Sequence, residues 1–264
     1  MKTTHTKFIG FFLSLCLVAG IAAGASAGQT TTDDMEAVIA QAQKAFAAAD
    51  QIEDTAQKMA AMREIAVTLR EHGRVEEAAG ILSQALFNAH QMQASPEKAV
   101  FFADIASEFY VLGLRNEAYG IFEQSEKIAQ SIGNKAKRVK SMIDICGKKR
   151  ETGERAEAEQ LLVAAMNHTN QMSDSFDKSI LLSAIACEHC KMGNKDKAMG
   201  LFNEAYSISK KLPSRSFKAK SLETVALGYA EAKEFDRALA VAGEIIPKKI
   251  RSRAVAAITS MMEQ

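Results

Sequence analysis

The sequence is poor in residues that interrupt helices or favour strands. It has no tryptophan, 3 prolines and 4 tyrosines among 264 residues. Proline breaks regular helices, and aromatic residues are favoured in strands, so their scarcity disfavours a sheet. Alanine, leucine, methionine, glutamate and lysine, which all have high helix propensity, are abundant. The composition therefore predicts an all-α protein.

An excess of charge of either sign is also absent. The chain has 33 lysine and arginine residues against 32 aspartate and glutamate residues. Two of the basic residues, Lys2 and Lys7, precede Gly28, so the chain from Gly28 onward has a formal net charge of about −1. Nucleic-acid binding usually requires a clustered basic surface that displaces counterions. The charge balance gives no support for a nucleic-acid partner.

The sequence also lacks a recognisable catalytic motif. It has no glycine-rich phosphate loop, no nucleophile elbow, and no paired carboxylates beyond those that helix periodicity explains. We therefore expect a protein that is not an enzyme and that holds no cofactor.

The first 27 residues have the features of a cleavable export signal. Lys2 and Lys7 form a basic start, residues 8–23 form an apolar run, and Ala25, Ser26 and Ala27 are the small residues that a signal peptidase accepts. An uncleaved anchor is the alternative, but the run is shorter than the roughly 18 to 20 apolar residues that span a bilayer. We expect cleavage after Ala27, a flexible segment over residues 28–34, no later membrane span, and a periplasmic or secreted protein.

The rest of the chain is an internal repeat with a step of 40 residues. Glycine recurs at this step, and Lys233 takes the next place in the series: Gly73, Gly113, Gly153 and Gly193. Other residues recur at fixed distances from this series. Eight residues before it lie the anchor residues Ile65, Ile105, Ile145, Ile185 and Val225, each followed by a small residue; five, nine and twelve residues after it lie further small and apolar residues. A fixed period of this size determines the whole fold.

Each unit is predicted to contain two helices, because apolar residues recur at three- and four-residue steps on both sides of the glycine. Glycine adopts a left-handed backbone without a side-chain penalty and closes the first helix. Lys233 is expected to adopt the same conformation at a modest cost in strain. Pro96 and Pro213 fall between units, and Ser95 is a good cap for the helix that begins at Pro96.

The period sets the organisation of a single solenoid over residues 35–262, with twelve helices. We expect a half unit, five full units and a closing helix over residues 35–54, 55–94, 95–134, 135–174, 175–214, 215–249 and 250–262.

The repeated residues resemble a known family. The spacing of Met62, Ile65, Ala66, Leu69, Gly73, Ala78, Leu82 and Ala85 is similar to that of the tetratricopeptide repeat (TPR). The resemblance covers residues 35–262, but these units are 40 residues long, whereas the family's usual unit has about 34 and often ends in proline. The resemblance implies a right-handed α-α superhelix of antiparallel helix pairs, in which the first helix of each pair lines a concave groove. Other helical solenoids with units near 40 residues are the alternative.

Helix geometry predicts which residues of the first helices face this groove. Positions −5, −2, +2 and +5 from each anchor point away from the core at about 100° per residue. The predicted binding residues among these positions are Arg63, Val67, Arg70, Ser107, Tyr110, Lys140, Ile143, Arg150, Ser183, Lys220 and Glu223. The positions hold five basic residues and one acidic residue, which indicates a mildly basic groove. The TPR resemblance implies capture of a protein or peptide, and the charge favours an acidic or amphipathic segment. A solvated helix surface is the alternative.

A basic residue also recurs seven positions before each anchor: Lys58, Lys98, Arg138, Lys178, Lys218 and Arg251. A cation near the start of a helix is disfavoured by the helix dipole. We expect a structural pairing, for example with an acidic residue early in a second helix such as Glu77 or Glu157.

Cysteine chemistry is the second functional hypothesis. Cys146, Cys187 and Cys190 follow the signal segment, and Cys187, His189 and Cys190 are the residues that could bind a metal or respond to oxidants. The signal is weak, because redox cysteines normally lie at a helix N-terminus, whereas this pair is predicted in mid-helix without a second Cys/His pair. Small residues in alanine-like packing positions are the structural interpretation.

Overall fold

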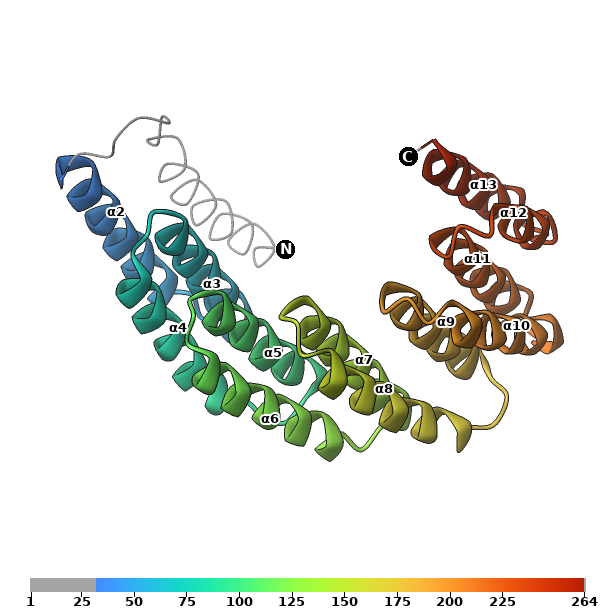
Figure 1. The fold of residues 1–264 in the computed structure, drawn as a ribbon, viewed down its shortest axis with the longest axis horizontal. Coiled ribbons are helices and arrows are strands. Elements are labelled where there is room, and N and C mark those ends of the chain that lie inside the picture. The colour runs from blue at the N-terminus through green and yellow to red at the C-terminus, as the bar shows by residue number, and fades with distance from the viewer. Residues whose placement is uncertain (1–31, 264) are drawn as a thin grey trace, which may run out of the picture. The chain divides into compact units, whose positions relative to one another are not determined.

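The computed structural model describes residues 32–263, which form helices without a strand (Figure 1). The signal peptide and its cleavage site, predicted within residues 1–27, lie outside the described residues. The helices are α2 (Thr32–Asp50), α3 (Thr55–Glu71), α4 (Val75–His90), α5 (Pro96–Val111), α6 (Arg115–Ser131), α7 (Lys135–Glu151), α8 (Arg155–Asn170), α9 (Phe176–Lys191), α10 (Lys195–Lys211), α11 (Arg215–Glu231), α12 (Phe235–Gly243) and α13 (Lys248–Met262). The predicted all-α class is confirmed. Over the described residues, no helix is both long and apolar enough to cross a membrane.

Helix α2 begins before its predicted start. Residues 32–34 were expected to belong to a flexible segment, but they form the first turn of α2. No glycine or proline follows Gly28 before this helix, so nothing in the local sequence interrupts it.

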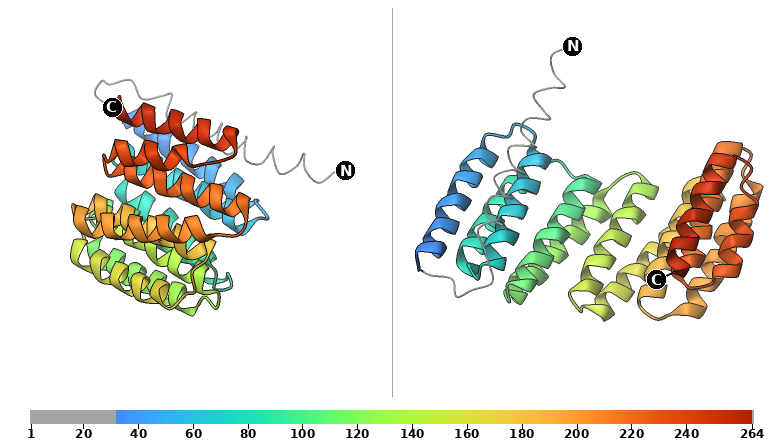
Figure 2. Two further views of the ribbon diagram at one scale, coloured as in Figure 1. Left: turned by 90° about the vertical axis from the view of Figure 1, so that its right-hand side faces the viewer. Right: turned by 90° about the horizontal axis from the view of Figure 1, so that it is seen from above.

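The chain divides into two compact units, one up to Ile128 and one from Ala129 onward. In the first unit, α2 and α4 pack on α3, and α5 packs on both α3 and α4. In the second unit, α8 packs on α7, α10 on α9 and α12 on α11, as Figures 1 and 2 show for the last two pairs. The first helices α7, α9 and α11 also contact one another in succession, and α13 packs on α11 and α12. The single continuous solenoid over residues 35–262 stays a prediction.

The periodic glycines end the first helix of each pair in the predicted conformation. Gly73, Gly113, Gly153 and Gly193 have φ between +73° and +86°, and Lys233 has φ +60°. At the first of these turns, Gly73 N donates to Arg70 O at 2.9 Å and Arg74 N to Leu69 O at 2.8 Å. This pair of bonds defines the Schellman motif, and all five turns have it. The prediction for Lys233 is therefore confirmed.

Side-chain caps distinguish the first helices from the second ones. A polar side chain accepts a hydrogen bond from the third residue of each first helix, at N–O distances of 2.9 to 3.4 Å; the capping residues are Asp54, Ser95, Asn134, Ser175 and Ser214. The second helices α4, α8, α10 and α12 have no side-chain cap. These second helices instead start directly from the Schellman turn.

The repeated apolar and small residues form the core. The anchors Ile65, Ile105, Ile145, Ile185 and Val225 are fully buried, and the alanines five residues after the glycine series are equally inaccessible. Ser125, which stands where three other units have alanine, donates a hydrogen bond from Oγ to Ala99 O at 2.6 Å. Small side chains at these positions let two helix backbones approach closely, and a larger side chain would overpack the contact.

The basic residues seven positions before the anchors have a structural role, but their partners differ from those expected. Lys98 Nζ donates to His90 O at 3.1 Å and to Met92 O at 2.7 Å, and Arg138 Nε donates to Ile132 O at 2.9 Å. These carbonyls belong to the end of the preceding helix and its linker. Because the C-terminus of a helix is its negative end, it offsets the unfavourable dipole of the helix in which the cation lies. The expectation of partners early in second helices is wrong for these residues.

Candidate functional site

The candidate site is the surface of the first helices that points away from their second helices, here named the first-helix face. It consists of positions −5, −2, +2 and +5 from each anchor. Most of the predicted binding residues lie on it: Arg63, Val67, Arg70, Ser107, Tyr110, Arg150 and Glu223 are half-buried, and Lys140 and Lys220 are exposed.

Two predicted binding residues do not reach this face. Ile143 is 5% exposed, and Ser183 is fully buried and donates a hydrogen bond to Ser179 O at 3.0 Å. Both occupy position −2, on α7 and α9, which contact each other. Successive first helices pack side by side, and a short or apolar side chain on that flank is covered. Assigning Ile143 and Ser183 to the binding surface is therefore a correction forced by packing between helices.

In the first unit, carboxylates on α5 pair with the arginines of α3. Arg63 Nη1 lies 3.4 Å from Asp104 Oδ2, and Arg70 Nε lies 3.6 Å from Glu108 Oε2. The Arg115 guanidinium lies 5.2 Å from the centre of the Tyr110 ring, within the range of a cation–π contact. The basic side chains of this part of the face are therefore engaged by neighbours in the same unit.

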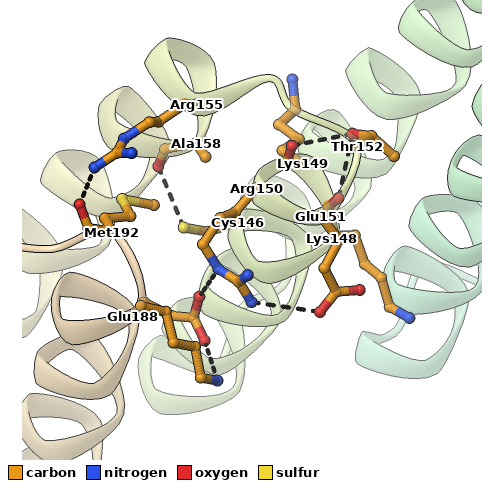
Figure 3. Close-up of polar contacts among 11 residues, drawn as sticks. Cys146, Lys148, Lys149, Arg150, Glu151, Thr152, Arg155, Ala158, Glu188 and Met192 are labelled. Atoms are coloured by element: carbon orange, nitrogen blue, oxygen red, sulfur yellow. Dashed lines mark hydrogen bonds and ion pairs between the residues drawn. The ribbon is translucent and has the colours of Figure 1, made fainter. Parts of the chain in front are cut away.

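In the second unit, the same arrangement joins α7 to α9 (Figure 3). Arg150 Nε donates to Glu188 Oε2 at 3.0 Å, and Lys191 Nζ donates to Glu188 Oε1 at 2.8 Å. The Glu188 side chain is 8% exposed. Gly147 leaves room for it, since a Cβ at that position would lie 3.8 Å from both carboxylate oxygens. A buried carboxylate with two cationic partners thus connects two consecutive first helices.

The ion pairs correct the expected charge of the face. Lys140 pairs with Asp144 on its own helix, so four of the five predicted basic residues have an acidic partner. The carboxylates come from positions −1 and +3, which a count restricted to four positions leaves out. The acidic partners neutralise the face, and its charge does not select an acidic ligand.

The three cysteines of the described residues are free thiols in chemically unreactive surroundings. Burial, followed by the charge of Glu188, raises the pKa of the Cys146 thiol to about 12. Burial and the negative charge of Glu231 also raise the pKa of Cys187 and of Cys190. The thiolate is the nucleophile and the metal ligand, so these conditions oppose both kinds of chemistry.

His189 does not complete a metal site with the two cysteines. The side chain is 7% exposed, and burial, followed by the charge of Lys197, lowers its pKa. Across residues 32–263, no group of three or more histidine, cysteine, aspartate or glutamate side chains is placed to hold a metal ion. His189 occupies a core position, four residues after the anchor, where other units have Leu69, Phe109 and Tyr229.

Comparisons with known proteins agree on the fold. No family model and no curated protein matches the sequence. Among solved structures, Ton1535 from Thermococcus onnurineus NA1 is similar, with 16% identity, coverage of 87% of this chain and 90% of that chain, and a TM-score of 0.52. A putative kinesin light chain with TPR-like repeats from Podosopora anserina is 16% identical, with coverage of 80% and 97% and a TM-score of 0.41.

A signal transduction ATPase with a tetratricopeptide repeat sensor, from Pyrococcus horikoshii, is 17% identical over 87% of this chain and 35% of that chain, with a TM-score of 0.42. The helix pairs of this chain, each closed by a left-handed turn and packed through small residues, have the arrangement that the sequence resemblance implied. In its fold, the chain is a TPR-like helical repeat protein.

Proposed function

We propose that the protein is a non-enzymatic scaffold that binds a protein partner through the first-helix face. The observation that carries this proposal is a contrast between positions within the repeat. The packing positions hold nearly the same residue in every unit, as the anchors do. Position +5, in contrast, holds a different kind of residue in most units: Arg70, Tyr110, Arg150, Cys190 and Ala230.

A uniform framework with a varied surface suits recognition of one specific ligand, because repeat proteins use the residues that stacking leaves free for binding. The chemistry of the face indicates the kind of ligand. Its charges are paired, and Val67, Tyr110, Cys187 and Leu227 add half-buried apolar or aromatic surface between them. An amphipathic protein segment matches this mixture better than an acidic one.

Export is part of the proposal. Its support is the basic, apolar and small-residue pattern of residues 1–27, which predicts cleavage after Ala27 and a periplasmic or secreted location. Radiolabelled pulse–chase, followed by N-terminal sequencing of the mature form, tests it. A mature protein that begins at Gly28 is expected, and a chain that retains Met1 in the cytosol would refute it.

Site-specific photo-crosslinking tests the binding face. Tyr110 lies half-buried on the first-helix face, and Tyr119 is 43% exposed on the second helix α6 of the same unit. A photoreactive phenylalanine analogue at position 110 should crosslink a discrete protein partner in cells, and the same analogue at position 119 should not. Equal crosslinking from both positions, or from position 119 alone, would contradict the proposal.

The thiol or metal hypothesis for Cys187, His189 and Cys190 gains no support from the geometry. Burial holds both thiols in their protonated form, and His189 packs among core residues. No observation favours it over a scaffold.

A further inference from the structure

One end of the second unit brings together basic side chains from several helices. The rings of Phe176 and Phe217, at the starts of α9 and α11, stack with centroids 4.9 Å apart. Tyr206 of α10 donates its hydroxyl hydrogen to Glu244 after α12 at 2.5 Å. Arg253 in α13 pairs with Glu223 in α11 at 2.6 Å. The N-termini of α9, α11 and α13 therefore lie at the same end as the C-termini of α10 and α12.

This end carries a surplus of positive charge. Six exposed residues there form no ion pair within residues 32–263, and we name them the basic edge: Lys211, Arg215, Lys220, Lys248, Lys249 and Arg251. The neighbouring carboxylates Glu244 and Glu223 already pair with Lys210 and Arg253. Asp177, in the first turn of α9, adds one negative charge. The edge stays strongly positive on a chain that is nearly neutral overall.

The helix dipoles add to this charge. Neither α11 nor α13 has an acidic residue in its first turn, and α13 has no side-chain cap at Pro247. Because a helix N-terminus is already positive, basic residues there cost stability unless an anion neutralises them. The arrangement therefore favours a negatively charged partner.

Exposed apolar side chains accompany the charges and decide between classes of partner. Phe217 is 50% exposed and Ile246 is 60% exposed, and each lies within two residues of the basic edge. Membrane-surface proteins combine these features, since lysine and arginine meet anionic headgroups while aromatic and aliphatic side chains enter the acyl boundary. The charges also come from three separate segments, so a plane of headgroups can meet them together more readily than one extended acidic peptide.

We propose that the basic edge, with Phe217 and Ile246, docks the protein on a membrane surface that contains anionic lipids. The first-helix face is a different surface, so this docking is independent of partner binding there. Phosphate headgroups would contact the six cations, and the two apolar side chains would enter the interface beneath them.

Vesicle co-sedimentation tests the docking. The purified protein should bind vesicles of phosphatidylcholine with about a third phosphatidylglycerol, should not bind pure phosphatidylcholine, and should be released by salt. The variant Lys248→Glu/Lys249→Glu should bind at least about tenfold more weakly. The matched control Lys44→Glu/Lys127→Glu makes the same charge change at exposed positions of the first unit and should bind like the unchanged protein.

A tryptophan reporter tests the apolar contact. The sequence has no tryptophan, so Phe217→Trp introduces a single fluorophore at the proposed contact. Its emission should shift to the blue with anionic vesicles and should be quenched by brominated lipid. The proposal is overturned by absent sedimentation, by equal weakening in both charge variants, or by an unshifted emission. Binding of poly-glutamate or duplex DNA without vesicle binding would assign the edge to another class of partner and would overturn it as well.

Discussion

Arg150 donates a hydrogen bond from Nε to Oε2 of Glu188 at 3.0 Å and so joins α7 to α9. The two residues are 38 positions apart, as are Arg70 and Glu108 in the first unit. Because the repeat has a step of 40, an arginine near the end of one first helix meets a carboxylate one turn earlier on the next. The first-helix face thus contributes to the stacking of repeats as well as to the surface offered to a partner.

Removal of Arg150 should therefore destabilise the protein. Arg150→Ala leaves the buried Glu188 carboxylate with Lys191 as its cationic partner, and we expect a loss of about 1 to 3 kcal/mol in the free energy of unfolding. Urea denaturation of Arg150→Ala, Glu188→Ala and the double variant measures their coupling. Lys127→Ala is the control, since its pair with Glu123 is fully exposed and should contribute less than about 0.5 kcal/mol. Purely additive effects at 150 and 188 would contradict the contact.

The contact of Gly228 with Phe202 predicts a size-dependent defect. A Cβ at Gly228 would lie 2.3 Å from Cε1 of the buried Phe202 ring. We expect Gly228→Ala to cost about 1 to 3 kcal/mol through overpacking, although alanine has the higher helix propensity. Leucine stands at the position equivalent to Phe202 in two other units, as Leu82 and Leu162. Phe202→Leu should therefore rescue part of the loss, and thermal melts that show no rescue would count against the close approach.

The left-handed turn at Lys233 predicts a stabilising substitution. Lys233→Gly should raise the free energy of unfolding by up to about 1 kcal/mol, because glycine relieves the strain at φ +60° and loses part of that gain through greater freedom when unfolded. The reciprocal change, Gly113→Ala, should be destabilising although a Cβ there would contact nothing within 4 Å. Calorimetry of both variants decides the matter; a neutral Gly113→Ala would mean that the turn is not strained.

The cysteines should react slowly in the native protein. Burial raises the pKa of all three thiols, and that of Cys146 reaches about 12, so the thiolate is scarce at pH 8. Titration with an aromatic disulfide reagent should be much slower in native conditions than in guanidinium chloride, with Cys146 the slowest. Rapid native labelling of Cys187 and Cys190 would instead revive the redox hypothesis.

Protonation of His189 should weaken the fold in mild acid. Burial lowers its pKa below 6.5, so the unfolded chain binds the proton first as the pH falls. This contribution to stability is present above pH 6.5 and is lost from there downward, toward the lower native pKa. His189→Leu places the apolar residue of the equivalent Leu69 at this position and should show a smaller loss of stability between pH 7.5 and 5.5. An unchanged pH dependence in that variant would contradict the assignment.

The backbone architecture was accessible from the sequence because each of its determinants is local. Glycine at φ near +80°, alanine at a close helix contact and isoleucine at a buried anchor each have one dominant physical role, and the repeat shows each role five times. Even Lys233 could be assigned by its place in the series. The prediction needed no information about how separate repeats pack.

The candidate site depended on contacts between repeats, and there the reasoning from one helix was incomplete. Ile143 and Ser183 point away from their own core but lie against the neighbouring first helix. Glu108 and Glu188 were left out because position +3 was not assigned to the face, although adding 38 to Arg70 and Arg150 would have found them. The approach of Gly228 to Phe202 has no equivalent in other repeats, so periodicity gave no signal for it.

The central claim is that partners bind on the first-helix face. Hydrogen–deuterium exchange, measured with and without the partner crosslinked from position 110, tests it most directly. We expect slower exchange in peptides from the first helices, most of all around Tyr110, and unchanged exchange in the second helices α4, α8, α10 and α12. Protection confined to those second helices would contradict the account.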